Sequence, residues 1–134
     1  MSVRSGEMEW ARKVTTKLTS LEGDKGVYED LFLVDTGATD SLAPGDQLRE
    51  IGVREQGKMV YELADGTVRE FPFGLARVEF MGEVTAGRVL FGSPDAEPIL
   101  GVTALDSVGI LVDPAKKTLR RLPAIPMKSV RRRA

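Results

Sequence analysis

Apolar and polar residues alternate along most of the chain, and this pattern predicts a succession of β-strands. In the segment 13–21, Val14, Thr16 and Leu18 fall on one face, and the segment 27–34 alternates at first and then becomes wholly apolar. A period of two residues is typical of a strand with one buried face, whereas an unbroken apolar run is typical of a strand that enters the core. We therefore expect two strands before residue 35, joined by a turn at 22–26.

The same alternation predicts hairpins in the middle of the chain. Apolar residues alternate across 58–74 on both sides of Asp65-Gly66, a dipeptide typical of a two-residue type I′ turn. Two further strands are expected around Met81-Gly82, within 75–92. An apolar run at 98–100 and a final strand after residue 109 complete the expected strands.

Two short segments have helical spacing instead. In the first, Leu42, Leu48 and Ile51 lie near one helical face, and Gly52 is the expected C-terminal cap. In the second, Thr103 and Asp106 have the spacing of a capping box, which predicts that a helix begins there.

These helices end in similar sequences, which indicates a weak internal repeat. Both read Leu-x-x-(Ile/Val)-Gly-(Val/Ile), at 48–53 and at 105–110, and each follows an apolar strand and a glycine-bearing turn. We expect two similar half-motifs packed about a pseudo-twofold axis. Many strands, regular turns and only two short helices predict a mainly β fold, a closed or nearly closed barrel.

Size and charge narrow the class of protein. The 134 residues suit one domain with a single core. Lys and Arg total 19 and Asp and Glu total 20, so the net charge of −1 lacks the basic excess typical of nucleic-acid-binding domains. No apolar run is long enough to span a bilayer, and the first ten residues contain no secretory signal. We expect a soluble, cytoplasmic protein that binds neither nucleic acid nor membrane.

Two residue types are missing from the sequence, and this restricts its chemistry. There is no cysteine and no histidine. Disulfides, thiolate and imidazole metal sites, and Ser-His-Asp or Cys-His catalysis are therefore excluded. Acid–base chemistry would depend on carboxylates, Lys or Tyr, and we expect no metal and no cofactor.

The candidate carboxylate is Asp35, which follows the apolar run of 31–34 in the triplet Asp35-Thr36-Gly37. Taken alone, an Asp-x-Gly triplet is typical of a turn after a strand. The alternative is a carboxylate placed at the end of a rigid strand because it does chemistry.

Four segments favour the second interpretation, because they occur in the order found in retropepsin-type aspartic proteases. They are the strand that runs into Asp-Thr-Gly-Ala at 35–38, the hairpin at 59–71, the strand pair within 78–92, and the apolar-apolar-glycine triplet at 99–101 before a helix. From about residue 27 to residue 113 the chain resembles this family, in particular its stand-alone bacterial-type members. The resemblance implies a closed acid-protease barrel of the half-length class, with a flap hairpin.

The resemblance also implies roles for individual residues. The catalytic turn would consist of Asp35, Thr36 and Gly37. Substrate would contact the loop after this turn and the flap, at Ala38, Thr39, Asp40, Leu63, Ala64, Asp65, Gly66 and Thr67. The second-half motif Ile99, Leu100 and Gly101 would support the catalytic loop. For Asp40, an exposed loop carboxylate without a role is an equally good interpretation, and Asp65-Gly66 is in the first place a turn.

Aspartic proteases need two such turns, and this sequence has one. A second Asp35 must then come from a second chain, which predicts an obligate homodimer acting on an extended peptide or protein substrate. We expect a flexible segment at 1–12, the protease domain at 13–122 and a basic tail at 123–134. The open alternatives are a non-catalytic peptide-binding or scaffold module with the same fold, and a structural domain cut from a longer protein.

Overall fold

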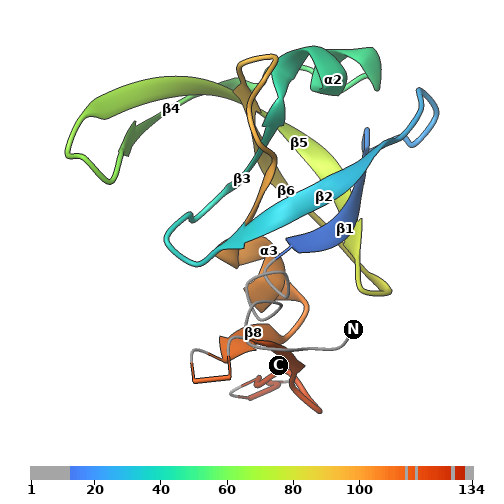
Figure 1. Ribbon diagram of the computed structural model, residues 1–134. Coiled ribbons are helices and arrows are strands. Elements are labelled where there is room, and N and C mark those ends of the chain that lie inside the picture. Colours follow the sequence, from blue (N-terminus) through green and yellow to red (C-terminus); the bar gives the residue numbers. More distant parts are fainter. Residues whose placement is uncertain (1–12, 114, 117, 128, 132–134) are drawn as a thin grey trace, which may run out of the picture.

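The structure is a computed structural model that describes residues 13–113, 115–116, 118–127 and 129–131 (Figure 1). The expected flexible segment 1–12 and part of the expected basic tail lie outside the described residues. The described residues form nine strands and two short helices. In chain order these are β1 Lys13–Thr19, β2 Tyr28–Asp35, β3 Ser41–Pro44, α2 Gly45–Glu50, β4 Gly57–Glu62, β5 Val68–Phe80, β6 Glu83–Gly92, β7 Ile99–Gly101, α3 Val102–Ser107, β8 Ile110–Asp113 and β9 Thr118–Arg121.

Six strands close into a barrel. Their order is β1-β2-β7-β3-β6-β5, and β5 pairs again with β1, so the ring is complete. The pairs β2–β7 and β3–β6 are parallel, and the other pairs of the ring are antiparallel. The predicted mainly β fold and its closed barrel are confirmed.

Apolar side chains from every strand of the ring fill the barrel. The largest fully buried apolar side chains are Phe32, Leu18, Leu48, Leu100, Leu105, Ile110, Val78 and Val89. Leu18 comes from the alternating segment of β1, and Phe32 comes from the apolar run of β2 that was expected to enter the core. Burial of such side chains stabilises the fold by about 1.5–3 kcal/mol each before conformational entropy is subtracted.

Strand β5 continues without a break for 13 residues, where the sequence pattern predicted arms of two separate hairpins. Its first half pairs with β4 and its second half with β6 and β1. Gly74 lies near the changeover, and a Cβ there would be 2.6 Å from the carbonyl oxygen of Arg54. This glycine therefore permits close packing of β5 against the backbone of Arg54.

The predicted type I′ turn at Asp65-Gly66 is also wrong. The amide of Gly66 donates to the carbonyl of Leu63 over 2.8 Å, and the amide of Leu63 donates to the carbonyl of Thr67 over 2.7 Å. Gly66 has a φ of +86°, but Asp65 does not have the positive φ that type I′ requires. The connection is a three-residue loop, 64–66, with a left-handed glycine at its end. Two consecutive left-handed residues, as in type I′, occur instead at Met81-Gly82, with φ of 52° and 77°.

The two helices begin at other residues than their sequence patterns suggested. Leu42 lies in strand β3, so the first helix begins only at Gly45. Gly52 follows this helix with a φ of +88°, as predicted, and its amide donates to the carbonyl of Arg49. Helix α3 begins at Val102, and no side chain caps it, so the predicted capping box at Thr103 is wrong.

The expected repeat is visible at the helix ends. Gly109 follows α3 with a φ of +73°, matching Gly52 after α2. Strand β8 then pairs with β9, a strand that the sequence pattern did not predict, to form a small separate sheet below α3 (Figure 1). Arg121 of β9 contacts the barrel through a 2.6 Å hydrogen bond to the carbonyl of Met81. Neither helix in the described part of the chain has the length or apolar character to cross a membrane.

Candidate functional site

Asp35 is the last residue of β2, a strand that pairs with β1 on one side and with β7 on the other. Strand β7 lies between β2 and β3, parallel to one and antiparallel to the other, with Asp35 opposite Gly101. The chain leaves β2 at Asp35, passes through the loop 36–40, and returns as β3 on the far side of β7. The predicted catalytic turn and the predicted supporting triplet are therefore neighbours in space.

The turn itself is closed by short-range hydrogen bonds. The carboxylate oxygen Oδ1 of Asp35 accepts the amide of Gly37 over 2.9 Å. The carbonyl of Asp35 accepts the amide of Ala38 over 3.0 Å. Thr36 is exposed at this turn. These bonds hold the Asp35 carboxylate in one orientation at the edge of the barrel.

Gly101 allows the loop 36–40 to pack against β7. A Cβ at this position would lie 2.5 Å from the carbonyl carbon of Asp40 and 2.8 Å from the carbonyl oxygen of Thr39. The amide of Gly101 donates to the hydroxyl of Ser41 over 3.0 Å, in a buried contact. The atoms that a Cβ of residue 101 would meet in Asp40 and Thr39 are backbone atoms, so no side-chain rearrangement could make room for a larger residue.

Helix α3 supports the same loop through its first amides. Val102 donates to the carbonyl of Ala38 over 2.8 Å, and Thr103 donates to the carbonyl of Thr39 over 3.2 Å. The first amides of a helix have no partner within the helix and need another acceptor. Here the loop carbonyls provide it, which explains why Thr103 does not form a capping box.

A pocket of about 510 Å³ opens beside Asp35. One part is the end of β2 and the following loop: Asp35, Gly37, Ala38, Thr39 and Asp40. A second part is the β4–β5 hairpin: Tyr61, Glu62, Leu63 and Ala64. The rest is an apolar wall: Leu42, Phe71, Leu90 and Ile99. The described chain thus brings the Asp35 carboxylate, a hairpin and apolar side chains around one open space.

Several residues predicted for the site lie elsewhere. Asp65, Gly66 and Thr67 are exposed at the tip of the hairpin and do not line the pocket. Leu100 and Gly101 are buried behind the loop, and the supporting role expected for them stays a prediction. Sequence reasoning missed Leu42, Tyr61, Glu62, Phe71 and Leu90. The period of two residues back from Leu63 could have placed Tyr61 on the same face of the hairpin.

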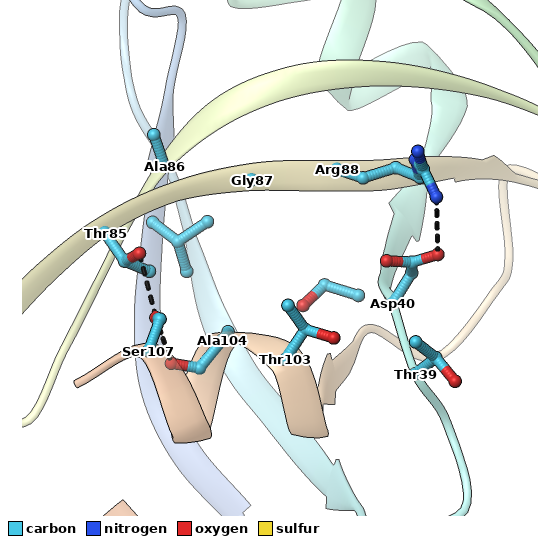
Figure 2. Close-up of a pocket in the computed structure, with 11 residues that line it drawn as sticks. Thr39, Asp40, Thr85, Ala86, Gly87, Arg88, Thr103, Ala104 and Ser107 are labelled. Carbon is cyan, nitrogen blue, oxygen red and sulfur yellow. Dashed lines mark hydrogen bonds and ion pairs between the residues drawn. The ribbon is translucent and has the colours of Figure 1, made fainter. Parts of the chain in front are cut away.

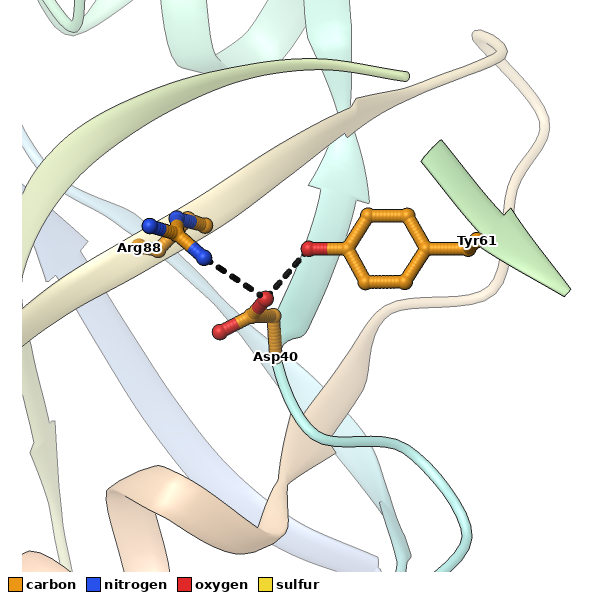
Figure 3. Close-up of polar contacts among 3 residues, drawn as sticks. All are labelled: Asp40, Tyr61 and Arg88. Atoms are coloured by element: carbon orange, nitrogen blue, oxygen red, sulfur yellow. Dashed lines mark hydrogen bonds and ion pairs between the residues drawn. The ribbon is translucent and has the colours of Figure 1, made fainter. Parts of the chain in front are cut away.

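Asp40 takes part in a three-residue polar cluster (Figure 3). It accepts a hydrogen bond from the hydroxyl of Tyr61 on β4, and its Oδ2 lies 3.4 Å from Nη1 of Arg88 on β6. Its side chain is only 8% exposed. The interpretation of Asp40 as an exposed loop carboxylate is therefore wrong.

The hydroxyl of Tyr61 stays protonated well above neutral pH. Burial, together with the hydrogen bond from Tyr61 to Asp40 and the charge of Asp40, raises the pKa of Tyr61 to about 12. Burial and the neighbouring Asp30 raise the pKa of Tyr28 to about 12 as well. Since the folded pKa lies above the unfolded value of about 10, this stabilisation is complete below pH 10 and is lost as the pH rises towards 12.

These two tyrosines are the only ones in the chain, so absorbance at 295 nm reports them directly. We expect about a tenth of the tyrosine to be ionised in the native protein at pH 11, against about nine tenths in guanidinium. A native transition centred near pH 10 would contradict the hydrogen bonds described for both side chains.

The tip of the hairpin is held by Asp65. Its Oδ1 accepts the hydroxyl of Thr67 over 2.6 Å and the amide of Thr67 over 2.9 Å. Both hydrogen bonds lower the pKa of Asp65, and the bond from the Thr67 hydroxyl has the larger effect. Because the folded pKa is depressed, the stabilisation is present at neutral pH and is lost only as the pH falls through that pKa. The tip is therefore most rigid when Asp65 is ionised.

A second, smaller cavity of about 40 Å³ lies between α3 and β6 (Figure 2). Thr39 and Asp40 line it together with Arg88 and Thr103. At its far end a 2.9 Å hydrogen bond joins the hydroxyls of Ser107 on α3 and Thr85 on β6. In the described residues no group of three or more carboxylates has the arrangement of a metal site.

Comparison with known proteins gave a match among solved structures alone. No family model matches the sequence, and no curated protein matches it. One matching structure is the solution structure of Simian Foamy Virus (mac) protease, with a TM-score of 0.49 and 16% sequence identity, covering 69% of this chain and 90% of that chain.

Proposed function

We propose that the protein is an aspartic endopeptidase that acts as a homodimer. The observation that carries the proposal is the pocket at the end of β2, where the oriented carboxylate of Asp35 meets the β4–β5 hairpin and an apolar wall. The chain presents one Asp-Thr-Gly turn. An aspartic protease needs two carboxyls that share a water and a proton, so the second Asp35 is supplied by a second chain.

The chemistry of the pair is hydrolysis of a peptide bond. One Asp35 carboxylate takes a proton from the water, whose oxygen bonds to the carbonyl carbon, while the other Asp35 donates its proton to the carbonyl oxygen. In the second step, the carboxyl that took the proton from the water gives it to the nitrogen, and the carbon–nitrogen bond breaks. As the carbonyl re-forms, one hydroxyl of the tetrahedral intermediate gives its proton to the other carboxylate. The products are a carboxyl end and an amine end, and the pair again holds one proton.

Substrate would bind as an extended strand between the Asp35 turn and the β4–β5 hairpin. Ala38 is small, which leaves room for a peptide chain next to the carboxylate. Leu42, Phe71, Leu90 and Ile99 would receive an apolar side chain of the substrate. The hairpin would act as a flap that closes over the peptide and excludes water.

The proposal is tested by incubating the purified protein with an unstructured protein from about pH 3 to pH 8 while its mass is measured in solution. We expect a dimer, cleavage that is fastest at mildly acidic pH, and inhibition by a statine-type transition-state mimic. Activity should fall towards neutral pH, because the reaction needs a pair of carboxyls that holds one proton. Dimers that bind but never cut would support the alternative, a peptide-binding module with the same fold.

A further inference from the structure

The cluster of Tyr61, Asp40 and Arg88 joins three parts of the molecule that are distant in sequence. Tyr61 lies on β4 of the hairpin, Asp40 at the end of the loop 36–40, and Arg88 on β6 of the barrel wall (Figure 3). The sequence separations from Asp40 are 21 residues to Tyr61 and 48 residues to Arg88. No other side-chain hydrogen bond within the described residues connects β4 to the loop.

The geometry of the cluster leaves the Asp40 carboxylate little freedom. Its side chain is 8% exposed. If it moved away from Tyr61 and Arg88, the negative charge of Asp40 would be buried without compensation. The guanidinium of Arg88 is itself held over the ring of Phe73, 4.7 Å from its centroid. The Tyr61 ring meets the edge of Phe71, with centroids 6.1 Å apart, in the apolar wall of the pocket. Each partner is thus fixed by a second contact in the barrel or hairpin.

The rest of the hairpin has few such attachments. Beyond Tyr61 the residues 64–70 are exposed, and β4 is the last strand of its sheet, paired with β5 alone. Without a further attachment, a hairpin whose outer strand pairs only with β5 would move about its base. The hydrogen bond of Tyr61 to a carboxylate that is itself ion-paired is charge-assisted, the stronger class of hydrogen bond.

We propose that Tyr61, Asp40 and Arg88 form a clasp that sets the resting position of the β4–β5 hairpin over the pocket. Tyr61 and Arg88 are positioning residues, and Asp40 transmits the position of the loop to the hairpin. The statement that the hairpin is a flap over a substrate rests on the proposed function. The position and mobility of the hairpin do not depend on that function.

The test compares Tyr61→Phe with wild type by amide hydrogen exchange at neutral pH. Phenylalanine keeps the ring on Phe71 and removes only the hydroxyl. We expect exchange at 59–67 to become about tenfold faster, while exchange in β1 and β6 stays as in wild type. In cleavage assays KM should rise about tenfold with kcat within about twofold, because the flap is less well placed to hold the peptide.

Tyr28→Phe is the matched control. The Tyr28 hydroxyl also donates to an aspartate, Asp30, over 3.1 Å, but on β2 and outside the pocket. Its loss should change neither hairpin exchange nor KM. A second variant, Asp40→Asn, keeps an oxygen acceptor for Tyr61 but loses the charge opposite Arg88, and should give an intermediate increase in exchange.

Equal hairpin exchange in Tyr61→Phe and wild type would overturn the clasp. An increase spread evenly over the barrel would overturn it too, because it would show a global loss of stability. If the wild type cuts no peptide, the hydrolytic proposal fails, and the exchange comparison still decides the clasp.

Discussion

Replacing Asp35 with asparagine should abolish cleavage and leave the fold and the dimer intact. Asparagine has nearly the same size and can still accept the amide of Gly37, which bonds to Oδ1 at 2.9 Å. It can neither take nor give a proton in the way a carboxyl does. In the homodimer both catalytic groups are lost at once, so we expect kcat/KM to fall by about 10³-fold or more.

The comparison uses purified variants, a peptide library at mildly acidic pH, and mass measurement in solution. Asp24→Asn is the matched control, since Asp24 is exposed in the β1–β2 connection and does not line the pocket. It should cut at the wild-type rate. Undiminished cleavage by Asp35→Asn would remove the assignment of Asp35 as the catalytic carboxyl.

Replacing Gly101 with alanine should destabilise the fold by about 3 kcal/mol, at the upper end of overpacking effects. The added Cβ would lie 2.5 Å from the carbonyl carbon of Asp40, against backbone that is fixed by β3 and α3. Conformational preference is not the cause, because the φ of −83° and ψ of 165° at Gly101 suit any residue. The loop 36–40 would have to move, so activity should fall with stability.

Denaturation in urea measures the change, and Gly87→Ala provides the comparison. Gly87 lies in β6, and a Cβ there meets nothing within 4 Å. This second variant should stay within about 0.5 kcal/mol of wild type. A Gly101→Ala variant that is equally stable would show that the loop does not pack on β7 as described.

The local part of the fold could be predicted from the sequence. The strand into Asp35, the hairpin at 58–74 and the glycine after the first helix are each encoded by neighbouring residues. Alternation with a period of two residues and a glycine at a positive φ each determine the backbone conformation of only a few neighbouring residues. The order of four such segments indicated the resemblance to retropepsin-type proteases. That resemblance implied that the 99–101 triplet supports the loop of Asp35.

The remaining features depend on contacts between distant segments, which a local pattern cannot encode. The sequence pattern divided 68–80 between two hairpins, yet β5 runs through this segment without a break. Gly74 lies in it where the backbone of Arg54 approaches, a contact that the neighbouring residues do not reveal. Likewise, the predicted capping box at Thr103 does not form, because carbonyls of the distant loop 36–40 accept the first amides of α3.

The clasp belongs to the same class of feature. Tyr61, Asp40 and Arg88 come together across 21 and 48 residues of sequence, and none of them stands in a recognisable motif. Asp40 followed the predicted catalytic turn closely enough to be considered for substrate binding. Its burial against Tyr61 and Arg88 could be seen only in the folded chain.

The most direct measurement of the central claim mixes the two forms of the protein. Wild type and Asp35→Asn are combined with about a ninefold excess of the variant and allowed to exchange subunits, so that about nine tenths of wild-type chains pair with the variant. If each active centre needs one Asp35 from each chain, cleavage falls about tenfold below that of the same amount of wild type alone. Cleavage that stays proportional to the wild-type chains present would show that one chain suffices, and the shared-carboxylate account would be wrong.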